Sequence, residues 1–393
     1  MDEAAPEVEA PNPPRTLWRR VTRWLGIGIL GILLAVVLVA WGLDTGPGHR
    51  FIADRVAGMA PSSGLRIRIG RIDGSIYSSA TLRDVRLYDT KGMFLEVPEL
   101  RLNWRPLSWA ANRLDIRSAV TDLAILYRAP KLKPSPTKRQ AILPGFDIRI
   151  DRLAIRRLRV EPAVTGKRHV ARILASADIR DGRANVNLNA FSTAGDRVRL
   201  ALDAEPDRDG FDVEFGLAAP SKGVIGALLG TERPITASIT GDGRWKAWKG
   251  RMKTDVSGFH IVDLALAVDS GRYKLSGMLA PAPITQGKIQ RLTSPTIKID
   301  GTATLADRRL DSTLSLKSGA VDIKASGVLD LAQSSFDDLG VDIRLLKPPA
   351  MFPNMTGRDI RLQANFNGPF ATADFDYLLT APRIAFDNTG FET

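Results

Sequence analysis

What the chain lacks excludes several kinds of chemistry. It contains no cysteine, so disulfides and thiolate metal sites cannot contribute to its fold or function. Histidine is scarce: His49, His169 and His260 lie far apart in the sequence, and none has a neighbour at a metal-ligand spacing. No zinc-protease, nucleophile-elbow or phosphate-loop motif occurs. The sequence therefore predicts a protein that is not an enzyme and that binds no cofactor and no metal.

Acidic residues are too few to balance the basic ones. The chain has 55 Lys and Arg against 43 Asp and Glu, a formal net charge of +12. Such a balance suits an anionic membrane surface or anionic lipid headgroups. Nucleic acid is the usual alternative partner of a basic protein, but the topology inferred next places most of the chain away from it. We expect no nucleic-acid partner.

One stretch, residues 24–43, has no charge at all. As a helix it would be about 30 Å long, the thickness of a bilayer core. Arginines precede it and Asp44 follows it, so the N-terminus is predicted to be cytoplasmic and the bulk of the chain to lie across the membrane. A cleaved signal peptide is the alternative, but its apolar core is shorter, about 7–15 residues. Anchor positions that we expect in the membrane are Trp24, Leu34, Val37 and Trp41.

The organisation predicted from these features has four parts. Residues 1–16 form a disordered cytoplasmic tail, and residues 17–44 form the transmembrane anchor. Residues 45–61 are a juxtamembrane helix or linker, and residues 62–393 are one elongated β domain.

From Leu65 onward the apolar residues recur with a period of two, which is typical of half-buried strands. Strands return about every dozen residues, and no helix between them is long enough for a parallel crossover. The sequence therefore predicts a mainly β fold, in which an antiparallel sheet curls and grows along one axis, with short helical insertions. Some 25 strands would extend about 100 Å. We expect insertions over residues 106–112 and 223–229, the second capped by Ser221, and a loop over residues 129–144.

Each predicted strand has one apolar and one charged face, so an open curled sheet would form an apolar groove. Over residues 148–160 the alternation slips twice, which indicates turns or bulges. The candidate groove-lining residues are Leu100, Leu102, Ile148, Ile150, Leu153, Ile155, Leu158 and Val160.

Three segments carry a family resemblance. Residues 70–89 (GRIDGSIYSSATLRDVRLYD) resemble the opening of TamB-type translocation and assembly proteins, which belong to the AsmA-like superfamily. Residues 97–116 (VPELRLNWRPLSWAANRLDI) are similar to their strand, short helix and strand segment. Residues 364–381 (ANFNGPFATADFDYLLTA) resemble their later strand pairs. Family members are usually longer and end in a C-terminal β domain, so the likeness is to their N-terminal part.

The resemblance implies a single-pass protein of the Gram-negative inner membrane with a long β-groove in the periplasm. It implies phospholipids as cargo, moved toward the outer membrane, and a TamA-type outer-membrane barrel protein as a partner in protein assembly. A second class of function stays open. The chain could instead be a scaffold that transports nothing and pairs its exposed strand edges with an outer-membrane barrel partner.

Overall fold

The computed structural model describes residues 41–58, 64–131, 147–180, 182–205, 208–244, 246–306, 308–386 and 389–392. The predicted tail and most of the predicted anchor, including Trp24, Leu34 and Val37, lie outside these residues. Trp41 is described, and 70% of it is exposed. Among the described residues, none of the helices has both the length and the apolar character that crossing a membrane requires.

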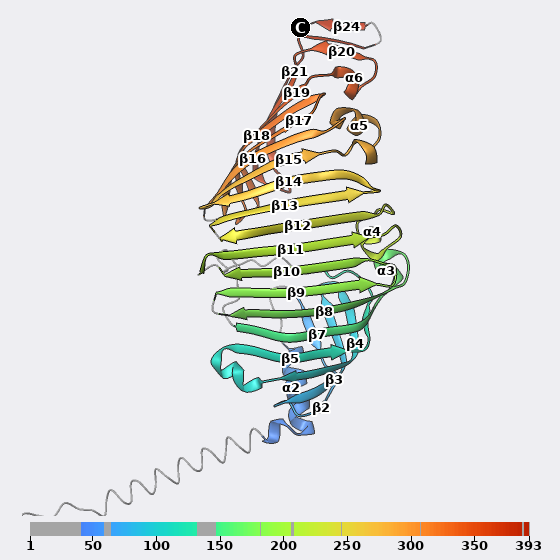
Figure 1. The fold of residues 1–393 in the computed structure, drawn as a ribbon, viewed down its shortest axis with the longest axis vertical. Helices are drawn as coiled ribbons and strands as arrows, with labels where there is room; N and C mark the ends of the chain where they lie inside the picture. Colours follow the sequence, from blue (N-terminus) through green and yellow to red (C-terminus); the bar gives the residue numbers. More distant parts are fainter. Residues whose placement is uncertain are drawn as a thin grey trace, which may run out of the picture.

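The fold is mainly β, as predicted, and it is built on one long curled sheet of 21 strands with a small sheet of three strands at the C-terminal end (Figure 1). The strands of the long sheet are β1 Arg66–Arg68, β2 Arg71–Gly74, β3 Ser79–Asp89, β4 Gly92–Trp104, β5 Arg113–Thr121, β6 Ala124–Leu126, β7 Asp147–Val160, β8 His169–Arg180, β9 Arg183–Ser192, β10 Arg197–Glu205, β11 Gly210–Ala219, β12 Ile235–Arg244, β13 Ala247–Val256, β14 Phe259–Asp269, β15 Arg272–Leu279, β16 Ile297–Ala306, β17 Arg309–Lys317, β18 Val321–Asp330, β19 Ser335–Leu345, β21 Ile360–Pro369 and β22 Asp374–Thr380. The small sheet comprises β20 Met355–Arg358, β23 Arg383–Phe386 and β24 Thr389–Glu392.

Strand pairing follows the chain almost everywhere. From β7 to β19 each strand pairs antiparallel with the next, and β19 then pairs with β21, which pairs with β22. The prediction of a wholly antiparallel meander was wrong at one place, because β5 and β6 both pair parallel to β7. A parallel pair needs a long connection but not a helix, and residues 127–146 supply that length.

Short helices interrupt the meander at a regular interval. After β7, β11, β15 and β19 come α3 Pro162–Thr165, α4 Val224–Leu228, α5 Gly287–Thr293 and α6 Pro348–Met351, all along the same side of the sheet (Figure 1). Their first residues, 162, 224, 287 and 348, are 61 to 63 residues apart. The sheet is therefore a repeat of four strands and one helical insertion.

Bulges keep the apolar side chains of β7 on one face. Its register with β8 shifts between Ile150 and Leu153 and again between Ile155 and Leu158. These are the two places where the sequence alternation slips, and the structure shows that both slips are bulges rather than turns. Without them a one-residue slip would turn half of the apolar side chains toward solvent.

The N-terminal end of the sheet is closed by α2 Gly46–Ala57. Ala53 packs with Ile72 and Ala80 in a buried cluster, and buried His49 donates a hydrogen bond from Nδ1 to the Ile72 carbonyl oxygen (3.0 Å). The helix starts directly at Gly46, because Pro47 in the first turn needs no donor there.

Two further insertions were predicted in the right places. The 3₁₀ helix η1 covers Pro106–Ala111, and α4 covers Val224–Leu228. The predicted Ser221 cap was wrong. The buried carboxylate of Asp196, from the turn before β10, accepts the Val224 and Ile225 amides (2.9 and 3.1 Å) and caps α4 from a distance in sequence.

A buried ion pair fixes the β3–β4 turn. The Asp89 carboxylate accepts hydrogen bonds from Arg128 Nη1 and the Lys91 amide (both 2.7 Å) and from the Lys131 amide (2.5 Å). The Arg128 guanidinium, together with these amides, outweighs burial and holds the pKa of Asp89 well below its usual range.

Asp89 should make stability fall in acid. Because its folded pKa is depressed, its contribution is complete above the ordinary value of 3.8 and is lost as the pH falls below that value. We expect Asp89→Asn to lower the Tm at pH 7 and to flatten the fall in Tm between pH 4 and pH 2, as measured by circular dichroism. The exposed Asp311→Asn should change neither; an equal effect of both would contradict a special role of Asp89.

Candidate functional site

The strand register places one uninterrupted apolar row across the long sheet. Each strand of the long sheet from β3 to β22, except β6, contributes one directly paired member. At about 4.8 Å per strand the row is about 80 Å long. We call it the apolar row; its members are Ala80, Leu102, Ala119, Leu153, Ala175, Leu188, Leu200, Phe215, Ile239, Met252, Leu264, Gly277, Ile299, Leu316, Ile323, Ile343, Leu362 and Leu379.

The opposite face of the same strands is charged. Asp263, beside Leu264 in β14, accepts from Arg251 Nη2 (2.6 Å), and Asp342, beside Ile343 in β19, accepts from Arg361 Nε (2.9 Å). Arg251 and Arg361 hold the pKa values of these two carboxyls below their usual range, against the effect of burial. The carboxylates are therefore ionised at neutral pH, and the sheet has a permanent difference in polarity between its faces.

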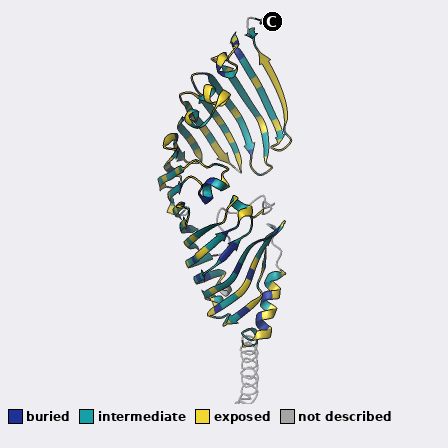
Figure 2. Ribbon diagram, turned by 90° about the vertical axis from the view of Figure 1, so that its right-hand side faces the viewer, coloured by how far each residue is buried: buried dark blue, intermediate teal, exposed yellow. Residues whose placement is uncertain are grey.

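Within the described residues no second layer covers the apolar face as it would in a sandwich. Most members of the apolar row are only half-buried, and none of the described large side chains is completely buried (Figure 2). Exposure is greatest at β22, where Phe375, Tyr377 and Leu379 are 59%, 68% and 60% exposed. Apolar surface of this extent on a folded protein normally marks a binding site.

All eight candidate lining residues lie on this apolar face. Leu102 and Leu153 belong to the apolar row, and Ile148 and Ile150 lie beside it in β7. The other four are less accessible: Val160 is 3% exposed, and Leu100, Ile155 and Leu158 pack against the buried cluster of Val85, Val97 and Ala124. This N-terminal end packs on itself, so substitutions there would disturb the fold before they tested any ligand path.

The candidate lining residues chosen from the sequence lie only in β4 and β7, and none lies in the longer part of the face, from β8 to β22. The signal was present, because those strands alternate as clearly as β7 does; Val262, Leu264, Leu266 and Val268 of β14 are one example. Only the strand register shows that these separate alternations join into one surface.

A tryptophan lies across the middle of this face. Trp248 is 7% exposed, and its ring centroid is 5.4 Å from that of Phe211. Gly241 and Gly250 make room for it: a Cβ on either would come within 2.0 or 2.1 Å of the indole ring. Since both glycines lie on the apolar face, the indole takes the place of two missing side chains.

The described residues contain no group of three or more histidine or acidic side chains that could hold a metal ion. The histidines are dispersed: His49 is buried beneath α2, and His260 bonds Asp255 on the exposed polar face (2.7 Å). Comparison of the chain with protein-family models, with characterised proteins and with solved structures gives no significant match.

The packing of Trp248 can be tested by a double-mutant cycle. Gly241→Ala should cost about 1–3 kcal/mol of unfolding free energy, because its Cβ meets the indole. In a Trp248→Leu background the same change should cost little, which gives a coupling of about 1 kcal/mol or more. Gly216→Ala is the control, since nothing lies within 4 Å of its Cβ. Equal costs of Gly241→Ala in both backgrounds would show that the two residues do not interact.

Proposed function

We propose that this protein carries phospholipids along its apolar face, from the inner membrane toward the outer membrane. The observation that supports this most is the apolar row, which has no polar member from β3 to β22. Each methylene of an acyl chain costs about 0.8 kcal/mol when it is exposed to water. A continuous apolar path removes that cost at every step, whereas a single polar strand would restore it.

The net charge and the openness of the face support the same cargo. The net charge of +12 favours anionic headgroups, which can remain in water beside the path while the acyl chains contact the sheet. From β8 to β22 most members of the apolar row are only half-buried, so a lipid could move along this part of the face without the sheet unfolding.

The resemblance of residues 70–89, 97–116 and 364–381 to TamB-type proteins supplies the setting of the proposal. Residues 24–43 would anchor the chain in the inner membrane with its N-terminus in the cytoplasm and its β domain in the periplasm. The same likeness makes a TamA-type barrel protein the partner to test for protein assembly.

The decisive variant is Leu264→Asp, at a half-buried member of the apolar row in β14. On an open face the carboxylate is hydrated, so the cost should be about 1 kcal/mol or less and the Tm should stay within about 4 °C. The charge would lie across the path of the acyl chains. We expect the amount of lipid that co-purifies with the protein, measured by mass spectrometry, to fall severalfold.

The matched control is Ala265→Asp, the next residue in the same strand, which is exposed on the polar face opposite Arg251. It should retain its lipid. A Leu264→Asp protein that unfolds would mean that the apolar face is a closed core. A folded Leu264→Asp protein with its full lipid content would exclude transport along this face.

A second candidate function is the scaffold, and one observation favours it. Every residue of β22 is exposed, and within the described part of the chain this strand pairs only with β21. An open edge can accept a strand of another protein. A photo-crosslinking residue at Leu378 should then capture one outer-membrane protein in cells, while the same residue at Ala265 should not. Equal capture at both sites, or at neither, would contradict the scaffold.

A further inference from the structure

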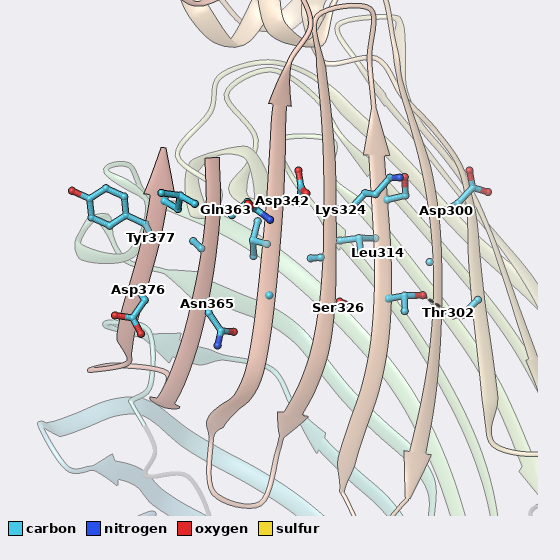
Figure 3. Close-up of a pocket in the computed structure, with 18 residues that line it drawn as sticks. Asp300, Thr302, Leu314, Lys324, Ser326, Asp342, Gln363, Asn365, Asp376 and Tyr377 are labelled. Atoms are coloured by element: carbon cyan, nitrogen blue, oxygen red, sulfur yellow. Dashed lines mark hydrogen bonds between the residues drawn. The ribbon is translucent and has the colours of Figure 1, made fainter. Parts of the chain in front are cut away.

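A hollow of about 950 Å³ lies across six strands, β16 to β19, β21 and β22 (Figure 3). Each strand contributes three consecutive residues, and the outer two of each three point to the polar face. The central residues, such as Leu314 and Val341, belong to the apolar face and contribute their backbone as the floor. The hollow is therefore a trench on the side opposite the apolar row, about 24 Å long across the strands.

Two ladders of polar side chains form the walls of this trench. In each ladder the members are directly paired from strand to strand. One wall comprises Asp300, Ser315, Lys324, Asp342, Gln363 and Leu378, which are all polar except the exposed Leu378 of β22. The other comprises Thr302, Thr313, Ser326, Gly340, Asn365 and Asp376, and only Gly340 of β19 has no polar side chain. Figure 3 shows Asp300, Lys324 and Asp342 along one side and Thr302, Ser326, Asn365 and Asp376 along the other.

The charges of the walls restrict what could bind. Asp300 already bonds Lys298 (3.2 Å), and Asp342 bonds Arg361 (2.9 Å). Among the described residues Lys324 and Asp376 form no ion pair, and they have opposite signs on opposite walls. A strongly anionic ligand would meet three carboxylates, and a strongly cationic one would meet the Lys324 ammonium. The trench therefore suits an uncharged ligand.

What the walls offer instead is hydrogen bonding. Hydroxyls of serine and threonine and the amides of Gln363 and Asn365 both donate and accept, and the carboxylates accept. They recur at every strand, so a ligand would have to present polar groups at a similar repeat along its length. An extended chain of sugar rings does this, since each ring carries hydroxyls at a spacing close to that of neighbouring strands.

We propose that the trench binds an extended, uncharged oligosaccharide chain, which lies across the strands between the two polar ladders. This site is independent of the apolar face, because it lies on the other side of the sheet. The protein could then hold a glycan on one face while the opposite face carries apolar cargo.

Gly340 allows a direct test. It lies between Ser326 and Asn365 in the second ladder, has no side chain there, and a Cβ would make only an ordinary contact, 3.7 Å from the Ser326 carbonyl oxygen. Gly340→Phe should therefore fold and fill the trench. Gly216→Phe is the matched control, on the polar face of β11 and outside the trench, with nothing within 4 Å of its Cβ.

Chitohexaose and cellohexaose are the probes, and isothermal titration of the whole protein is the measurement. At least one of them should bind more tightly than its disaccharide. Gly340→Phe should weaken the affinity for that hexasaccharide about tenfold or more, which is the loss expected when two or three hydrogen bonds are prevented. Gly216→Phe should leave this affinity unchanged. If Gly340→Phe does not fold, Gln363→Ala with Asp376→Ala replaces it, with the same expected loss.

The outcomes are distinct. No binding of either hexasaccharide, or binding that Gly340→Phe leaves unchanged, would overturn the glycan site. Tighter binding of oligolysine than of the neutral sugars would overturn it in favour of a cationic ligand. Co-purifying lipid should be the same in Gly340→Phe as in the wild type, so failure of the glycan site would leave lipid transport standing.

Discussion

Backbone pairing between neighbouring strands is the constraint on which the rest of the structure depends. In an antiparallel pair, directly opposed residues point to the same face of the sheet. The register of each pair therefore decides which side chains of the next strand lie on the apolar face. Here the register is maintained from β7 to β22, with bulges wherever the sequence alternation slips. A single uncompensated slip would place a charged side chain in the apolar row and divide the face into two.

The two faces of the sheet differ in how their side chains are stabilised. The polar face satisfies its charges locally, through cross-strand pairs such as Arg251 with Asp263 and Arg361 with Asp342. The apolar face needs a covering layer to be buried, and in the part of the chain that the structure describes only its N-terminal end has one, where α2 and the Val85 cluster pack. Much of the hydrophobic free energy that a sandwich gains by closing is thus still available along this sheet.

Much of the fold could be predicted from the sequence because a period of two is a local property. The bulges in β7 and the insertion at α4 were readable in the same way. The parallel pairing of β5 and β6 with β7 could not be predicted in this way, since it joins segments that are distant in sequence. The Asp196 cap could not be predicted either, because its carboxylate lies 28 residues from the Val224 amide.

The four-strand repeat was missed although turn glycines at Gly195, Gly258 and Gly319 recur in step with it. The polar trench could not be foreseen, because only the register brings its ladders together.

The single parallel junction also affects how the chain can fold. From β8 onward nearly every strand pairs with its neighbour in sequence, so each hairpin can form with little loss of loop entropy and add to the one before it. The pairing of β7 with β5 and β6 must instead close the connection over residues 127–146. That closure joins the segment attached to α2 to all the later repeats. At this step assembly of the sheet depends on contacts between segments that are distant in sequence, and no longer on hairpins between neighbours. We therefore expect this closure to limit the folding rate.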